Sequence, residues 1–223
     1  MQGPQIHPLG DSALLCSLPA PATLTQQQRI WALAKQADGW DEVAEVVPGM
    51  NNLTLIARRP VLDLEPLAQR IMQLWPTLDA THTEGRIVEI PVVYGGAGGP
   101  DLDAVARHTG LSTDEVIRRH SAGDYVVYFI GFMPGFAYMG GLAPELATPR
   151  HTTPRMSIPA GSVGIGGEQT GIYPMASPGG WQLLGRTALP LFDPAQEPPT
   201  LLRPGDRVRF VVERTERVQQ VTP

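Results

Sequence analysis

The sequence GFMPGFAYMGGLAPELATPRHTTPRMSIPAGSVGIGGEQTGIYPMASPGGWQLLG, residues 131–185, settles the architecture of this chain. Glycine and proline recur every few positions, and the apolar runs between them are very short. Both residues interrupt helices, so regular helices are not expected in this segment. Short strands separated by many turns predict a β-barrel or a β-sandwich.

Strand and helix patterns flank this segment on both sides. Strands are predicted over residues 86–94, 125–131 and 207–211, and helices over residues 101–109 and 112–122. A glycine-rich loop at residues 95–99 separates the first strand from the first helix. The whole region is therefore predicted to be a barrel domain that also carries two short helices.

The first part of the chain alternates strand and helix signals. Thr25 and Gly39 are expected to bound an amphipathic helix. A second helix is predicted over residues 64–74, and strands over residues 12–18, 42–47 and 53–57. The order β-α-β-β-α, with a final strand expected after the second helix, indicates a small split βαβ sandwich.

A polar linker over residues 79–85 separates the two parts. We place the domain boundary there, with an N-terminal domain over residues 1–85 and a barrel domain over residues 86–223. The predicted fold class is therefore α+β, with a small split-βαβ domain followed by a β-barrel.

The composition is that of a globular protein, with 42% apolar and 17% charged residues among 223. A net charge of −5 and a pI near 5.5 give no general attraction for nucleic acid or anionic lipid. No run reaches the roughly 18 apolar residues that span a bilayer, and no signal-peptide pattern opens the chain. We therefore expect a cytoplasmic protein with neither nucleic acid nor membrane as a partner.

Metal and disulfide chemistry is not predicted. Cys16 is the single cysteine, so it has no internal disulfide partner, and its apolar neighbours indicate a buried strand residue. The five histidines lie far apart, without the spacing of metal ligands. We expect no tightly bound metal.

Two kinds of anion-binding signal are present, and both are weak. The glycine-rich segment at residues 161–171 offers backbone N–H groups that can cradle an anion, but no Gly-Lys-Ser/Thr follows it. Residues 95–99 fail the same test. Arg150 and Arg155 flank a segment bounded by two prolines. Their guanidinium groups either hold an acidic substrate, or stay solvated in a loop or pair with local acidic residues.

Four longer motifs point to a family. They are VPGMNNLT at residues 47–54, PVVYGGAGGPDL at 91–102, GFMPGFAY at 131–138 and IPAGSVGIGG at 158–167. In this order they resemble the family of the 5-oxoprolinase B subunit, and the resemblance covers nearly the whole chain. That family also includes a sporulation-kinase inhibitor and proteins labelled allophanate hydrolase subunit 1.

The resemblance implies a small N-terminal α/β domain and a cyclophilin-like C-terminal barrel. It also implies a complex with two further proteins, the C subunit in direct contact and the A subunit. Such a complex opens 5-oxo-L-proline to L-glutamate while hydrolysing ATP with Mg²⁺. Opening an unstrained lactam is unfavourable, which makes coupling to ATP chemically sensible. We expect the chain to be inactive alone.

The resemblance also directs attention to the dense motifs of the barrel. We hypothesise that they line one face of an active site shared with the C subunit. The candidate substrate-binding residues are Phe132, Phe136, Tyr138, Arg150, Arg155, Ser162, Gln169, Thr170, Tyr173, Ser177 and Trp181. Arg155 is the first choice to bind a substrate carboxylate or a phosphate, and no catalytic residue is assigned.

Two other functions are compatible with the same motifs. One is a regulatory binding module that inhibits a histidine kinase, which needs no catalytic groups. The other is half of a urea carboxyltransferase or allophanate hydrolase-like complex. That activity needs a biotin carrier, and no Met-Lys-Met biotinylation site occurs in this chain.

Overall fold

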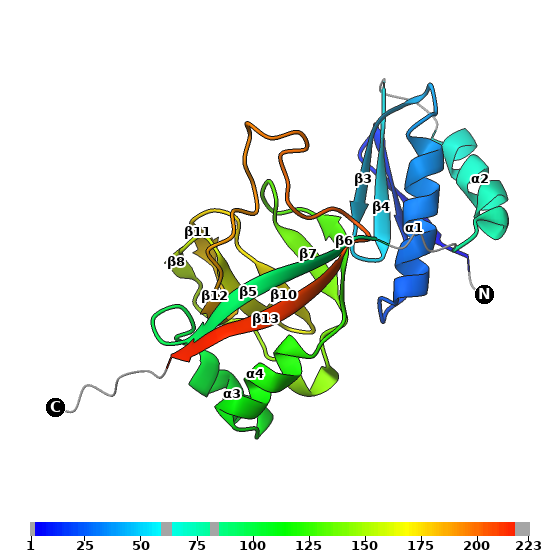
Figure 1. Ribbon diagram of the computed structural model, residues 1–223. Coiled ribbons are helices and arrows are strands. Elements are labelled where there is room, and N and C mark those ends of the chain that lie inside the picture. The colour runs from blue at the N-terminus through cyan, green and yellow to red at the C-terminus, as the bar shows by residue number, and fades with distance from the viewer. Residues whose placement is uncertain (1–2, 59–63, 81–84, 217–223) are drawn as a thin grey trace. The chain divides into compact units, whose positions relative to one another are not determined.

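The computed structural model describes residues 3–58, 64–80 and 85–216. The chain divides into two compact units, residues 1–83 and residues 84–223 (Figure 1). Of the predicted linker, residues 81–84 lie outside the described residues. Each unit has a hydrophobic core of its own.

The first unit is a four-stranded antiparallel sheet with two helices. Its strands are β1 (Gln5–Leu9), β2 (Ala13–Ser17), β3 (Val43–Gly49) and β4 (Asn52–Ala57), in the order β1-β2-β4-β3. Helix α1 (Leu24–Ala37) joins β2 to β3, and β4 pairs with both of these strands. This is the predicted split βαβ arrangement.

One face of this sheet forms the core of the first unit. Side chains alternate between the two faces of a strand, so every second residue of β2 and β4 points to the same side. Helix α2 (Glu65–Leu74), which continues into the short 3-10 helix η1 (Trp75–Thr77), packs into the same core as α1. The buried apolar side chains include Leu14, Cys16, Leu53, Leu55, Ile30, Leu33 and Ile71.

Two predictions for this unit were wrong in detail. Helix α1 is capped by Thr23, not Thr25: the Gln26 backbone N–H donates to Thr23 Oγ1 at 3.3 Å, and Gln26 Oε1 accepts from the Thr23 N–H at 3.0 Å. Thr25 lies inside the helix and cannot satisfy its first N–H groups. The additional strand is β1 at the start, and within the described residues of this unit no strand follows α2. Strand β1 is almost wholly exposed and therefore lacks an apolar alternation.

The second unit is a closed barrel, as the sequence predicted, and its seven strands follow the order β10-β7-β6-β13-β5-β12-β9. The barrel strands are β5 (Ile87–Gly95), β6 (Tyr125–Ile130), β7 (Ala137–Gly140), β9 (Ser162–Gly166), β10 (Gln169–Ile172), β12 (Gln182–Arg186) and β13 (Arg207–Glu216). Strands β8 (Arg155–Ile158) and β11 (Ser177–Gly179) form a separate two-stranded sheet. The long strands β5 and β13 pair in parallel, which joins the two ends of the unit (Figure 1).

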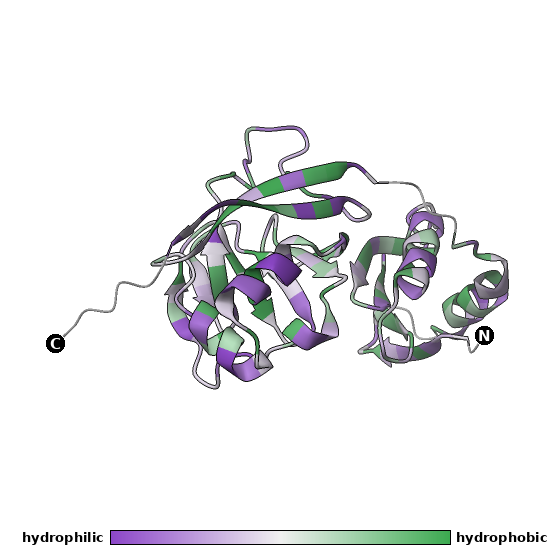
Figure 2. Ribbon diagram, turned by 60° about the horizontal axis from the view of Figure 1, so that its bottom comes forward, coloured by the Kyte–Doolittle hydropathy of each residue, from purple (hydrophilic) through white to green (hydrophobic). Residues whose placement is uncertain are grey.

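The helices of the second unit follow β5. Helix α3 (Leu102–Thr109) packs beside β12 and helix α4 (Thr113–Ser121) beside β13, while a 3-10 helix η2 (Pro144–Leu146) lies in the segment that was expected to lack α-helices. Polar and apolar bands alternate along the helices (Figure 2), which is typical of helices with one buried side. None of the helices in the described ranges is long and apolar enough to cross a membrane.

A chain of hydrogen bonds runs through the barrel interior around His120, which is fully buried. Thr170 Oγ1 donates to the Gly164 carbonyl at 3.0 Å, so its oxygen accepts from His120 Nε2 at 2.9 Å. His120 Nδ1 then carries no proton and accepts from Tyr94 OH at 2.7 Å. Every polar atom of the imidazole is therefore satisfied in the neutral state.

Candidate functional site

An aromatic pocket of about 270 Å³ opens next to β11. Its walls come from the loop before β7, from β7, from the segment between η2 and β8, and from residues on either side of β11. Six of the eleven predicted substrate-binding residues line it, namely Phe132, Phe136, Tyr138, Arg150, Tyr173 and Trp181. The remaining lining residues are Pro154, Pro178, Gly179 and Gly180.

Phe136 is the centre of the aromatic wall. Its ring meets Trp181 at a centroid distance of 5.5 Å and Tyr173 at 5.2 Å, both edge to face, and Tyr138 at 4.8 Å. Edge-to-face pairs at these distances are favourable because the positive ring edge meets a negative ring face. The four rings therefore form a preorganised apolar wall rather than a set of independent side chains.

Glycines behind the wall leave room for the rings. A Cβ atom at Gly166 would lie 2.5 Å from Trp181 Nε1, and one at Gly171 would lie 3.1 Å from the same indole and 3.2 Å from the Phe136 ring. Two glycines of the motif-rich segment thus serve close ring packing and not only turns. Neither has a positive φ, so steric space alone explains the absence of a side chain.

Gly166→Ala is expected to push the Trp181 indole out of place and to lower the free energy of unfolding by about 1–3 kcal/mol, the usual cost of overpacking. Near-ultraviolet circular dichroism and urea unfolding would measure both effects. Gly39→Ala is the matched control, because a Cβ there approaches its nearest neighbour only to 3.8 Å. Equal spectra and equal stability for the two variants would contradict the packing role of Gly166.

Phe132 stands at the rim of the pocket in a strained conformation. Its φ is +66° and its side chain is 62% exposed, while its ring contacts Phe136 edge to face at 5.5 Å. A left-handed conformation costs a residue with a Cβ about 1–2 kcal/mol. The short hydrogen bond from the Met133 N–H to the Gly131 carbonyl, 2.7 Å, holds the turn. A large apolar side chain kept exposed by a strained turn indicates a binding role.

Arg150 brings positive charge to the pocket. Its guanidinium carbon lies 5.7 Å from the centre of the Trp181 ring, and no described acidic residue pairs with it. Burial raises the pKa of both Tyr138 and Tyr173, and the charge of Arg150 acts in the opposite direction on both hydroxyls. The phenols stay protonated at neutral pH and can donate hydrogen bonds beside this cation.

Arg155, the first choice for anion binding, is held by Asp101. Its Nη2 donates to Asp101 Oδ1 at 2.7 Å, and the second carboxylate oxygen accepts from the Leu183 backbone N–H at 2.7 Å. His151 Nε2 makes a longer contact of 3.3 Å with the same oxygen. Burial raises the pKa of the Asp101 carboxyl, but Arg155, Leu183 and His151 outweigh burial and keep it below its ordinary value. The charge of Arg155 is therefore compensated, whereas that of Arg150 is not.

The other predicted residues lie outside the aromatic pocket. Ser162 and Thr170 are buried in the barrel strands β9 and β10, and Thr170 is committed to the interior hydrogen bonds of His120. Gln169 begins β10 opposite Gly166. Ser177 begins β11, and its Oγ is buried without a hydrogen-bond partner in the described part of the chain. The proposed site keeps the six lining residues and leaves out Ser162 and Thr170, because their side chains are enclosed by the barrel.

Sequence reasoning missed Asp101 as a part of the site. The residue was assigned to the start of a helix and to the family motif at residues 91–102, but to no site, and its side chain makes no capping hydrogen bond at the helix start. Its partner Arg155 is 54 positions away. The available signal was an acidic residue two positions after a glycine-rich loop and inside a family motif, which does not identify a partner.

Comparison with known proteins shows the family of the chain. The chain matches the family model described as carboxyltransferase domain, subdomain C and D, over residues 4–202. It is 52% identical to the 5-oxoprolinase B subunit of Escherichia coli O157:H7 over 214 residues, which cover 96% of this chain and 98% of that protein. The chain belongs to the family of the 5-oxoprolinase B subunit.

Solved structures agree with the fold. The crystal structure of TTHA0988 superposes with a TM-score of 0.74 at 36% identity, covering 95% of this chain and 40% of that longer chain. The urea carboxylase of Kluyveromyces lactis superposes with a TM-score of 0.77, covering 94% of this chain and 22% of that one. At 20% identity this second likeness shows the fold alone.

Proposed function

We propose that this chain is the B subunit of an ATP-dependent 5-oxoprolinase complex that hydrolyses 5-oxo-L-proline to L-glutamate. The observation that carries the proposal is the aromatic pocket, in which preorganised rings surround a guanidinium group without an acidic partner among the described residues. The name of a relative that is 52% identical over 96% of the chain supports the same activity.

The substrate matches the pocket in size and chemistry. 5-Oxoproline is a five-membered lactam with one carboxylate, and it is small enough for a cavity of about 270 Å³. Its ring would lie against Phe136 and Trp181, and its carboxylate would accept hydrogen bonds from Arg150. Arginine suits this role because its planar fork matches the two oxygens of a carboxylate.

The chain's own residues would bind and orient the lactam. Holding the ring between rigid aromatic side chains fixes the direction of the amide and lowers the entropy cost of reaction. The hydroxyls of Tyr138 and Tyr173, kept protonated by burial, can donate to a substrate oxygen. Asp101 would act as a positioning residue, because it ties Arg155 to the backbone of β12 beside the pocket.

The rest of the reaction would depend on partner proteins. Phosphorylation of the amide oxygen by ATP turns an unfavourable ring opening into a favourable one, and such transfer needs Mg²⁺ and fixed positive groups. Within the described residues no group of three or more His, Cys, Asp and Glu side chains could hold a metal ion. Mg²⁺ would bind the phosphates of ATP. We place the complex, with the C subunit in direct contact and the A subunit as the third member, in the cytoplasm.

The first experiment is the release of glutamate from 5-oxo-L-proline by this chain mixed with its A and C partners and ATP. Mixtures that lack one protein at a time serve as controls, and the chain alone is expected to release none. If the assembled complex releases no glutamate, the proposed activity is wrong. Urea carboxylation and kinase inhibition would then be measured.

Arg150→Gln is expected to raise the KM for 5-oxoproline roughly 10- to 100-fold, because a charge-assisted hydrogen bond contributes about 1.5–3 kcal/mol. Steady-state kinetics of the assembled complex would measure the change. Arg107→Ala removes an exposed arginine from the last turn of α3, outside the pocket, and should leave KM unchanged. A normal KM in a folded, assembled Arg150→Gln complex would show that the carboxylate binds elsewhere.

A further inference from the structure

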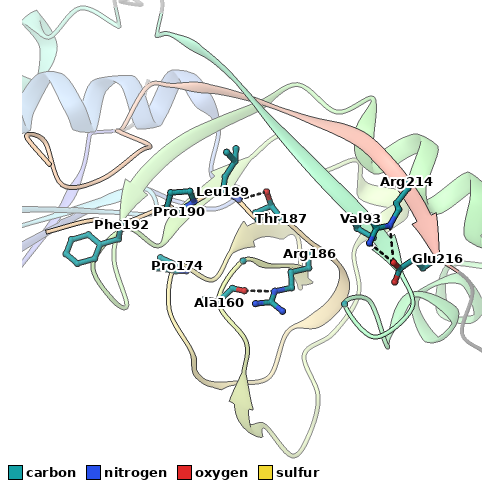
Figure 3. A pocket seen from close by; sticks show the side chains of 13 residues that line it. Val93, Ala160, Pro174, Arg186, Thr187, Leu189, Pro190, Phe192, Arg214 and Glu216 are labelled. Carbon is teal, nitrogen blue, oxygen red and sulfur yellow. Dashed lines mark hydrogen bonds and ion pairs between the residues drawn. The ribbon is translucent and has the colours of Figure 1, made fainter. Parts of the chain in front are cut away.

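A second and larger cavity, of about 610 Å³, lies on the barrel and shares no lining residue with the aromatic pocket. It is bounded by the end of β12 and the segment after it, by the turn before β9, and by the end of β13 (Figure 3). None of the eleven residues predicted from the sequence lines it. The function proposed above therefore leaves this cavity without a role.

Both glycine-rich motifs of the sequence meet at this cavity, on either side of Arg186. A Cβ atom at Gly98 would lie 3.0 Å from Arg186 Cβ, and one at Gly161 would lie 3.5 Å from Arg186 Cγ. Gly161 has a φ of +80°, and a side chain there would also collide with the Thr187 carbonyl. The two glycines thus leave a slot in which the aliphatic stem of Arg186 is held.

The guanidinium group of Arg186 is oriented but not neutralised. Its Nε donates to the Ala160 carbonyl at 2.8 Å, and its two Nη groups have no hydrogen bond or ion pair with the described part of the chain. Arg214, the second arginine of the cavity, donates Nε at 3.0 Å and Nη2 at 2.8 Å to Glu216 Oε1. That pair cancels its own charge, so Arg186 leaves the cavity with a net positive charge.

The opposite end of the cavity is apolar. Leu189, Pro190 and Phe192 gather on one side of Arg186, and the Arg214–Glu216 pair lies on the other (Figure 3). Ligand sites combine such apolar walls with a few fixed polar groups. A ligand that satisfies both ends has an anionic group for the free edge of Arg186 and an aromatic or other apolar portion for Phe192.

We propose that this cavity binds a nucleoside polyphosphate, with a phosphate group on the Nη edge of Arg186 and the base against Phe192. The proposal rests on the function proposed above, since ATP is the nucleotide that such a complex consumes. Arginine is well suited to the task, because its fork donates two parallel hydrogen bonds to phosphate oxygens. The chain would then hold the lactam and the nucleotide in two separate cavities of one barrel.

Substituting Arg186 and Arg150 one at a time tests the two cavities separately. In the assembled complex, Arg186→Gln is expected to raise the KM for ATP about 10-fold or more and to leave the KM for 5-oxoproline within about twofold. Arg150→Gln should do the reverse. Arg186→Lys keeps the positive charge but loses the planar guanidinium group with its parallel donors. Its KM for ATP should therefore lie between those of Arg186→Gln and the parent chain. Thermal unfolding of each variant would establish that the fold is intact.

A binding measurement makes the inference independent of lactam hydrolysis. Fluorescence of trinitrophenyl-ATP would be recorded with the full chain, alone and together with its partners, without 5-oxoproline. Two results would support the proposal even if no glutamate is formed. Arg186→Gln should weaken binding of trinitrophenyl-ATP about 10-fold. Tripolyphosphate should displace the bound probe, whereas adenosine should displace it poorly. Equal affinity of the parent chain and of Arg186→Gln for trinitrophenyl-ATP overturns the proposal. Failure of Arg186→Gln to co-purify with the partners also overturns it, since the cavity would then be a protein contact.

Discussion

Asp101→Ala is expected to lower the free energy of unfolding of the second unit by roughly 3 kcal/mol, the largest single effect we predict for this barrel. Asp101 is only 5% exposed and accepts hydrogen bonds from Arg155 and from the Leu183 N–H. Without the carboxylate, the Leu183 N–H loses its partner in a buried position, and Arg155, whose side chain is 33% exposed, loses its counter-ion. Removing one member of such a group costs more than the pair contributes, because the remaining charge stays desolvated.

Urea unfolding of the purified chain would measure this effect, and two variants make it specific. Asp101→Asn keeps an acceptor for Leu183 but removes the charge that faces Arg155, so it should lose less stability than Asp101→Ala. Asp103→Ala removes a carboxylate from the first turn of α3 and should cost below about 1 kcal/mol. Equal losses for the alanine variants at positions 101 and 103 would show that the ion pair with Arg155 contributes nothing.

The same substitution should also affect the aromatic pocket. The ion pair fixes Arg155 in β8 against β12, and β8 pairs with β11, which contributes to the pocket wall. We therefore expect Asp101→Asn, if folded, to raise the KM for 5-oxoproline with a smaller change in kcat. A purely structural role would change stability and leave KM as it was.

The second large effect is a loss of stability in mildly acidic solution. Burial lowers the pKa of His120 to about 3, whereas an unfolded histidine titrates near 6.5. Between these values the unfolded chain binds one more proton than the folded chain, so the free energy of unfolding decreases as the pH falls. The contribution of neutral His120 is complete above pH 6.5, and roughly 2.7 kcal/mol of it should be lost at pH 4.5.

Other groups act in a different pH range. The carboxyls of Asp101 and Glu115 also have lowered pKa values, that of Glu115 about 2. A carboxyl with a lowered pKa stabilises the fold above its unfolded pKa near 4, so these residues lose their contribution only below about pH 4.5. The change in the free energy of unfolding between pH 6.5 and 4.5 therefore reports on His120 and not on these carboxyls.

Urea midpoints recorded every half pH unit would test this prediction. His108→Gln, which removes an exposed histidine from the last turn of α3, is the matched control. His120→Gln is expected to be less stable at pH 7 but to show a flatter profile, because the titrating group is gone. A flat profile in the parent chain between pH 6.5 and 4.5 would mean that His120 is not neutral in the folded barrel.

The two cavities would give the barrel the division of roles proposed above, with the lactam in one and the nucleotide in the other. A lactam and a nucleotide differ in size and charge, and the pockets differ in the same sense, at about 270 and 610 Å³. Each contains one arginine without an acidic partner in the described residues, Arg150 in the first and Arg186 in the second. Measuring the KM for ATP and for 5-oxoproline after substitution of each arginine is therefore the most direct test of how this chain contributes to the complex.

Local patterns in the sequence determined the kind of structure each segment forms. The density of glycine and proline after Gly131 argued against regular α-helices and predicted the barrel. Ser112, at a predicted helix start, caps α4 in the structure. Aromatic and basic residues in the same segment predicted six members of the pocket. These inferences succeed because turn chemistry, capping and periodicity act between residues close in the chain.

Only the tertiary structure decided which side chains meet. Barrel closure brings Asp101 to Arg155, His120 to Thr170, and two separate glycine motifs to Arg186. These partners are 25 or more positions apart, and their pairing follows from strand order and register, which no local pattern records. The sequence therefore named all four rings of the aromatic wall, but the choice of Arg150 over Arg155 and the role of Arg186 came from the closed barrel.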